Sequence, residues 1–311
     1  MSVDVKIIGN DSSLGKIFND SYLTERQHYL EVGPDKVVLP GKYEELYGCI
    51  DNLEVRDDDV FICAFPKTGS RWTQELVWLI LNNLDFKSAR DVQLGMRSPF
   101  LDIELLFDDI QETKKIQQLV NYASPRCIRS HLQWSLLPKA IASGIKQPKI
   151  IVVLREPEDT CTSYFHQAKV MEGFRGSWDD FCHLFIEGKV LFGPYFTHVL
   201  SFWEQRHRSN VMFVKYNKMK VDLRGTIEEV ASFLGKNLTK TNVEDLFNHL
   251  SFDNLKKCQG FNMEKFIKGD VNPFLRIGKI GDYKNAMSDE VIKVLKKQKE
   301  QYLAGTGLTF D

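Results

Sequence analysis

A buried strand, a short polar loop and an amphipathic helix follow one another between residues 60 and 84, and this unit constrains the fold most. The segment reads VFICAF-PKTGS-RWTQELVWLILNNL. Val60–Phe65 is a continuous apolar run, typical of a parallel strand that is covered on both faces. Apolar residues then recur at roughly helical spacing through Ser70–Leu84. The unit therefore predicts an α/β fold.

Three more short apolar runs predict strands, at Arg126–Ser130, Lys149–Leu154 and Val211–Lys215. Helical patterns follow these runs, at Glu158–Met171, Trp178–Lys189, Phe192–Arg206 and Thr226–Leu234. This alternation predicts a central parallel β-sheet flanked by helices, with ligands bound at the carboxyl ends of its strands. No repeat or long Pro/Gly/Ser linker divides the chain. We expect residues 1–311 to form one domain, in which residues 1–57 are a mostly polar lead-in with turns.

The composition is that of an ordinary globular protein, with 43% hydrophobic residues, 27% charged residues and a net charge of −1. This balance gives no reason to expect a nucleic-acid partner. The N-terminus lacks the pattern of a signal peptide, and the longest apolar stretch is too short to span a bilayer. The six cysteines are scattered without a C-x-x-C pair, which argues against a zinc site and a disulfide framework. We expect a cytoplasmic protein without a metal or a membrane anchor.

The loop between the first strand and its helix has the chemistry of an anion site. A helix start offers unpaired N–H groups and the positive end of a dipole. Lys67 adds a charge, Thr68 and Ser70 add hydroxyls, and Gly69 permits a close approach of the backbone. The loop is P-loop-like but lacks the G-x-x-x-x-G-K-[ST] spacing, which disfavours an ATP-type kinase. The same residues also fit an ordinary turn in which Ser70 caps the helix and Lys67 is solvated.

The string FPKTGSRW, residues 65–72, resembles the YPKSGTTW donor loop of cytosolic sulfotransferases. Their donor is 3′-phosphoadenosine 5′-phosphosulfate (PAPS). The likeness runs from about Leu53 to Lys284, and the stretch around this loop resembles insect members. It implies that Lys67 contacts the oxygen that bridges phosphate and sulfonate, and that Trp72 stacks on adenine rather than merely packing in the core. It also implies a set of residues around the 5′-phosphate: Thr68, Gly69, Ser70 and Arg71.

Two further segments resemble the parts of this family that bind the 3′-phosphate. IIVVLREPEDTCTSYFHQ is similar to R-N-x-x-D-x-x-x-S-Y, and it implies Arg155 and Ser163 as ligands. NPFLRIGKIGDYK is similar to P-F-x-R-K-G-x-x-G-D-W-K, and it implies Arg276 and Gly278. Two matched residues contact adenine in the family, although core packing is the alternative for both: Tyr216 and Phe252.

The segment RCIRSHLQW resembles the K-T-H-L-P run that carries the catalytic histidine of the family. His131 takes that place, where a group that titrates near neutral pH can remove the proton of an acceptor hydroxyl. Arg129 stands where many members have lysine. It either stabilises charge during transfer or pairs with a surface carboxylate. Phe100, in a P-F-L segment, and Phe266, in the late loop, are expected to line an apolar acceptor pocket.

Four positions depart from the family pattern. Arg71 and Leu250 replace threonines on the donor side, Ile277 replaces a lysine beside the 3′-phosphate, and Gln167 replaces an aromatic residue at the acceptor gate. The dimer motif of the family is degraded to KNAMSDEVIK, which favours a monomer or a weak homodimer.

Three functions remain open at this point. The first is transfer of sulfonate from PAPS to a hydroxyl of a small, mostly hydrophobic phenol, steroid or other alcohol, with His131 as the general base. The second is dehydration of an allylic alcohol through a transient sulfonated form, as in some insect relatives. The third is a non-catalytic carrier of small hydrophobic molecules, which the four departures suggest.

Overall fold

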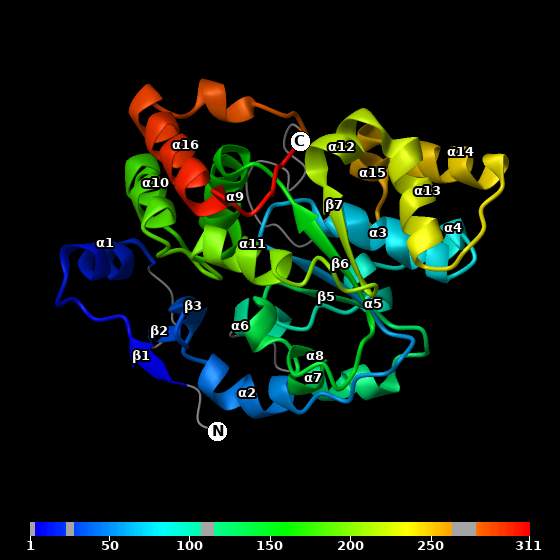
Figure 1. The fold of residues 1–311 in the computed structure, drawn as a ribbon, viewed down its shortest axis with the longest axis horizontal. Helices are drawn as coiled ribbons and strands as arrows, with labels where there is room; N and C mark the ends of the chain where they lie inside the picture. Colours follow the sequence, from blue (N-terminus) through cyan, green and yellow to red (C-terminus); the bar gives the residue numbers. More distant parts are fainter. Residues whose placement is uncertain (1–3, 23–27, 107–114, 263–277) are drawn as a thin grey trace.

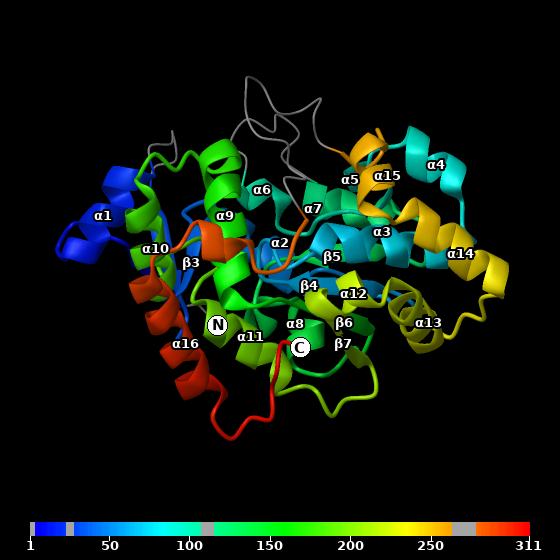
Figure 2. The same cartoon turned by 90° about the horizontal axis from the view of Figure 1, so that it is seen from above.

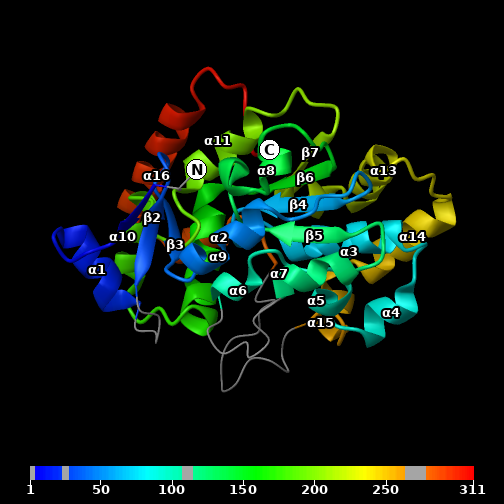
Figure 3. The same cartoon turned by 90° about the horizontal axis from the view of Figure 1, so that it is seen from below.

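The computed structural model describes residues 4–22, 28–106, 115–262 and 278–311 (Figure 1). Its centre is a parallel sheet in the order β5-β4-β6-β7 (Figure 3). The strands are β4 (Val60–Ala64), β5 (Cys127–Ser130), β6 (Lys149–Leu154) and β7 (Val211–Lys215). All four strand predictions and the α/β fold class are confirmed. β4 and β5 are each one residue shorter than expected, at one end.

Alternate residues of β4 serve two separate cores. Val60, Ile62 and Ala64 pack on one face of the sheet, whereas Phe61 and Cys63 pack on the other. This period of two is the pleat of a strand that is buried on both sides. The first face is covered by α3 (Ser70–Leu81), α13 (Leu223–Phe233) and α14 (Lys240–His249). The second core includes residues of α9 (Pro157–Met171), α10 (Trp178–Ile186) and α11 (Tyr195–Trp203).

All five predicted helices are confirmed, but several begin or end at other residues than predicted, for local reasons. α3 stops at Leu81 because Asn83 and Leu84 have positive φ angles of 52° and 61°, which a right-handed helix excludes. Similarly, α11 begins at Tyr195 instead of Phe192, whose φ is 63°. The remaining α-helices of the described residues lie around these layers. They are α1 (Ser13–Ser21), α2 (Tyr43–Asp51), α4 (Phe86–Asp91), α5 (Leu94–Arg97), α6 (Ile103–Leu106), α7 (Lys115–Gln118), α8 (Lys139–Ala142), α12 (Tyr216–Val221), α15 (Phe252–Lys257) and α16 (Asp289–Leu303).

The expectation of a polar lead-in over residues 1–57 is wrong. This region forms an antiparallel sheet from β1 (Val5–Ile7), β2 (Tyr29–Val32) and β3 (Val37–Pro40), beside α1 and α2 (Figure 1). Each strand has only three or four residues, so no sequence window shows a clear alternation. Long-range contacts stabilise these strands instead, because β2 and β3 pack into the same core as Phe61.

Backbone hydrogen bonds join β3 to the segment before α11. The N–H of Phe192 donates to the carbonyl oxygen of Val38 at 2.8 Å, and the N–H of Val38 donates to that of Gly193 at 3.0 Å. Viewed from above, α1, α10 and α16 gather at one end of the molecule, whereas α4, α13 and α14 lie at the other (Figure 2). Among the described helices, none has the length and apolar character needed to cross a membrane.

Candidate active site

The loop after β4 has two residues with unusual backbone conformations. Lys67 has a φ of 69° and Gly69 a φ of 110°, and α3 begins at the next residue. Gly69 is the N-cap, and no side chain in the described residues caps this helix, so the proposed turn with Ser70 as cap is wrong. The Thr68 hydroxyl donates to the carbonyl oxygen of Phe65 at 2.9 Å, which holds the loop closed. The first N–H groups of α3 can therefore serve an anion.

The loops after β4, β6 and β7 meet at the carboxyl edge of the sheet. Arg155, directly after β6, donates from Nη1 to the carbonyl oxygen of Lys67 at 3.1 Å. Its guanidinium carbon lies 4.3 Å from the ring centre of Tyr216, the first residue of α12. A Cβ on Gly69 would lie 2.8 Å from Cδ2 of the same ring. Glycine is thus required both by its φ angle and by the close approach of Tyr216.

The late segment returns to the same edge. The N–H of Gly281 donates to Oδ2 of Asp159 on α9 at 2.9 Å, and that oxygen lies 4.0 Å from Nη2 of Arg155. Ser163 is half-buried on α9, four residues beyond Asp159 and hence on the same side of the helix. Gly278 lies against Phe252, since a Cβ there would come within 2.6 Å of the ring. Arg276 and Phe266 lie outside the described residues.

Two aromatic rings expected beside adenine come from α3 and α15. Trp72 donates from Nε1 to the carbonyl oxygen of Leu250 at 2.9 Å, and its ring centre lies 6.0 Å from that of Tyr216. The Lys220 ammonium lies 5.7 Å from the ring centres of both Trp72 and Phe252. Lys220 was missed by the sequence analysis. Its position four residues after Tyr216, on the same side of α12, was the available signal.

His131 follows β5 and is held by its backbone and its ring. Its N–H donates to both carboxylate oxygens of Asp102 at 3.1 Å, and its carbonyl oxygen accepts from Nε2 of His198 at 3.0 Å. Ring Nδ1 lies 2.6 Å from the carbonyl oxygen of Ala64. Because a carbonyl oxygen can only accept, Nδ1 carries the proton, which leaves a lone pair on Nε2 of the neutral ring. Asp102 and His198 had no recognisable signal in the sequence.

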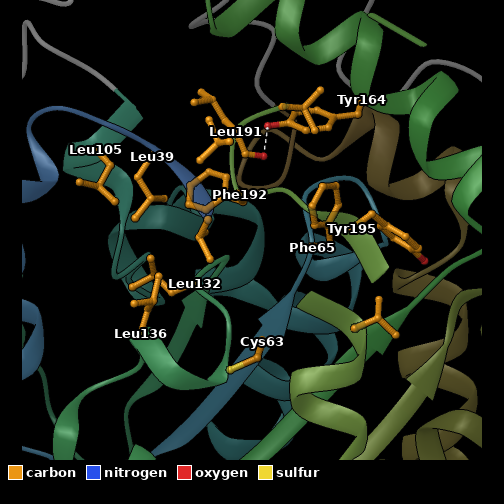
Figure 4. Packing of buried hydrophobic residues seen from close by; sticks show 14 of the residues in the cluster. Leu39, Cys63, Phe65, Leu105, Leu132, Leu136, Tyr164, Leu191, Phe192 and Tyr195 are labelled. Carbon is orange, nitrogen blue, oxygen red and sulfur yellow. Dashed lines mark hydrogen bonds between the residues drawn. The ribbon is translucent and has the colours of Figure 1, made fainter. Parts of the chain in front are cut away.

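The surroundings of His131 keep it neutral. Its side chain is 5% exposed, and burial, followed by the charge of Arg129, lowers its pKa well below 6.5. The rings of Phe100 and Phe192 lie 5.0 and 5.5 Å from its ring centre. Phe192 belongs to the buried cluster that also contains Phe65 (Figure 4). The neutral imidazole thus keeps the free lone pair that a general base needs.

Arg129 is a buried cation beside this histidine. Its guanidinium carbon lies 3.9 Å from the ring centre of Phe100, and burial, then the charge of Arg71, lowers its pKa to about 9. No carboxylate among the described residues lies within ion-pair distance of it. The alternative of a surface ion pair is therefore wrong. Its charge remains available to an anion in the site.

Other cations join Arg129 at this edge. Burial, followed by the charges of Arg155 and Arg71, lowers the pKa of Lys67 to about 7, against an opposing effect of Glu172. Arg71 donates from Nη2 to the carbonyl oxygen of Phe261 at 2.5 Å, and burial lowers its pKa to about 10. A group of cations this close together suits a ligand with several negative charges. Among the described residues, no group of His, Cys, Asp and Glu side chains could hold a metal ion.

Comparisons with known proteins agree with this geometry. The family model for the sulfotransferase domain matches residues 57–307. A luciferin sulfotransferase from Photinus pyralis, an insect, is 33% identical over 97% of this chain and 87% of its own length. A crystal structure of retinol dehydratase with androsterone and the inactive cofactor PAP has a TM-score of 0.90 at 26% identity, and 99% of each chain is covered. A second one, with retinol and PAP, has the same TM-score at 25% identity and covers 100% of this chain and 99% of that one. The chain belongs to the sulfotransferase family, and its likeness to insect members is confirmed.

Proposed function

We propose that this protein transfers the sulfonate group of PAPS to the hydroxyl of a small, mostly hydrophobic acceptor, with His131 as the general base. The observation that carries the proposal is the hydrogen bond between Nδ1 of His131 and the carbonyl oxygen of Ala64. It leaves Nε2 free to take a proton, and burial keeps the ring neutral at physiological pH.

The donor is assigned to the loop after β4 and to the edge beside it. Lys67 and the first turn of α3 would hold the 5′-phosphosulfate, Trp72 and Phe252 would enclose adenine, and Arg155 would bind the 3′-phosphate. The proposal is supported by the junction of these elements around Tyr216 and by the PAP complexes of the two retinol dehydratase structures.

In the reaction, PAPS supplies the sulfonate group, and its 5′-phosphate is the leaving group. Nε2 of His131 takes the proton of the acceptor hydroxyl, whose oxygen forms the new bond to sulfur. Lys67, in its charged form, stabilises the bridging oxygen on which negative charge develops as the S–O bond breaks. Arg129 stabilises the negative oxygens of the sulfonate as it passes from the bridging oxygen to the acceptor oxygen. The products are a sulfate ester and 3′,5′-adenosine bisphosphate (PAP).

The acceptor site follows from the rings around His131. Phe100 and Phe192 flank the base with apolar surface, so a hydroxyl next to Nε2 would be attached to an apolar skeleton. Phe266 is assigned to the same pocket from the family pattern. Phenols, steroids and other alcohols are the classes that we propose.

Incubation with PAPS and a panel of phenols, steroids and aliphatic alcohols tests the proposal, with ester formation followed by mass spectrometry. His131→Ala should lower the rate by at least about 100-fold, since removing a general base costs about that much. The exposed His207 provides the control, because His207→Ala should leave the rate unchanged. Absence of transfer with every acceptor, or full activity of His131→Ala, would refute the proposal.

A dehydratase is the second candidate, favoured by the TM-score of 0.90 with two structures of retinol dehydratase. In that case an allylic sulfate ester would lose sulfate, and the product would contain no sulfur. The mass of the product from an allylic alcohol separates the two reactions. A non-catalytic carrier would bind the small molecules but would not bind PAP. Calorimetry with PAP would distinguish a carrier from an enzyme.

A further inference from the structure

Lys220 occupies an unexpected place within the donor site. Its ammonium lies 5.7 Å from the ring centres of Trp72 and Phe252, two residues assigned to adenine. It is half-buried on α12, one turn beyond Tyr216. Burial and then the charge of Arg155 lower its pKa, although Asp253 opposes them. Lys220 thus shares one environment with four residues of the proposed donor site.

Lys218, on the same short helix, behaves differently. Its ammonium is exposed and pairs with the carboxylate of Glu229 at 2.5 and 2.7 Å. Lys220 has no ion pair with any residue that the structure describes. Asp253 acts on Lys220 only from beyond ion-pair distance. A half-buried cation that is held over two aromatic rings without an ion pair costs desolvation energy that the cation–π contacts only partly offset. An anionic ligand at this place would form the ion pair that the Lys220 ammonium lacks.

The sequence also lacks a cation that the family pattern has beside the 3′-phosphate. Ile277 stands where the family pattern has a lysine beside the 3′-phosphate. Arg155 is assigned to this phosphate, and it lies close enough to Lys220 for its charge to depress the pKa of the lysine. A lysine has a flexible stem, so its ammonium can leave the space between the rings when adenine stacks there.

We propose that Lys220 is a specificity-determining residue that binds the 3′-phosphate of the nucleotide together with Arg155, in place of the lysine absent at position 277. This proposal deepens the proposed function and rests on it. Its consequence is selective: Lys220 should matter for nucleotides with a 3′-phosphate and little for those without one. A residue that only packed against adenine would affect both kinds equally.

Calorimetry on the full chain with PAP and with adenosine 5′-phosphate tests this selectivity. Lys220→Met should weaken PAP binding by about 10- to 100-fold, the usual effect of losing a hydrogen bond to a charged group. It should weaken binding of adenosine 5′-phosphate by less than about threefold. Lys220→Arg keeps the charge and should keep PAP affinity within about threefold. Lys218→Met, on the same helix, is the matched control and should change neither affinity.

Two outcomes would overturn the assignment of Lys220 alone: unchanged PAP affinity in Lys220→Met, or equal losses for both nucleotides. Thermal unfolding of each variant shows whether a loss reflects misfolding, and Lys220→Arg provides the test if Lys220→Met fails to fold. If the wild type binds no PAP, the proposed function fails, and the role of Lys220 fails with it.

Discussion

Nδ1 of His131 lies 2.6 Å from the carbonyl oxygen of Ala64, so the last residue of β4 sets the tautomer of a histidine that follows β5. The donor loop begins immediately after Ala64. One strand end therefore orients the histidine that we propose as the base and also places the loop that we assign to the donor. β4 and β5 are hydrogen-bonded neighbours in the parallel sheet. The sheet therefore fixes the distance between His131 and the donor loop.

Lys67 should take up a proton when the nucleotide binds. Its pKa is lowered to about 7 by burial and neighbouring cations, so at pH 8 most of it is neutral in the free protein. A phosphate beside it favours the charged form and raises this pKa. PAP binding should therefore consume a proton at pH 8, and affinity should fall with rising pH, by at most about tenfold per unit.

Calorimetry at pH 8 in two buffers with different ionisation enthalpies measures this uptake. Lys67→Met should abolish it, whereas Lys218→Met, which changes an exposed lysine, should retain it. Equal binding enthalpies of the wild type in both buffers would contradict the assignment.

Gly69→Ala should destabilise the protein and weaken nucleotide binding. The new Cβ would lie 2.8 Å from the ring of Tyr216, at a φ of 110° that side chains rarely adopt. A strained backbone of this kind costs about 1–3 kcal/mol, and the contact with Tyr216 adds to it. Gly235→Ala is the control, since its φ of 70° is also positive but no atom lies within 4 Å of the new Cβ. Urea unfolding should show a clearly larger loss for Gly69→Ala, and equal losses would exclude the close approach.

The parallel sheet and the donor loop could be predicted because their signals are local. β4 and β6 are nearly continuous apolar runs, and the sequence changes abruptly from apolar to polar residues at the loop Lys67–Ser70. The spacing of Lys220 from Tyr216 was a local signal, but its contacts with Trp72 and Phe252 could not be predicted, because these residues are far away in the sequence. The antiparallel sheet was missed for the same reason. Its strands are too short to show a period, and the contacts of β3 with Phe192 and Gly193 stabilise it.

Leu30→Ala should lower the free energy of unfolding by about 2–5 kcal/mol, as usual for a leucine deleted from a packed core. Leu30 is 0% exposed, and it belongs to the core that also contains Phe61 of the parallel sheet. Ile7 is its paired residue on β1 but is 58% exposed, so Ile7→Ala should cost less than about 1 kcal/mol. Urea unfolding followed by circular dichroism measures both. A second transition for the N-terminal region would contradict our prediction that residues 1–311 form one domain.

Asp102→Asn should make stability less sensitive to pH. Burial raises the pKa of Asp102 to about 7 despite its hydrogen bonds from Ser130 and the N–H of His131. Between about pH 4 and 7 the folded protein therefore keeps a proton that the unfolded chain releases. A rise in pH through this range favours unfolding, by at most about 1.4 kcal/mol per unit, and the decline ends above pH 7. The stability of the wild type relative to Asp102→Asn should accordingly fall from pH 5 to pH 8.

The control for Asp102 is Asp85, an exposed carboxylate at the start of α4. Hydrogen bonds from Ser88 lower its pKa below the usual value, so its contribution to stability is complete above about pH 4 and is lost only in more acidic solution. The difference between the wild type and Asp85→Asn should therefore stay constant from pH 5 to pH 8. Urea unfolding at four pH values across this range measures both differences. If the difference for Asp102→Asn also stayed constant, Asp102 would be charged at every pH from 5 to 8. Its carboxylate would then accept the hydrogen bond from the N–H of His131 as a permanent anion.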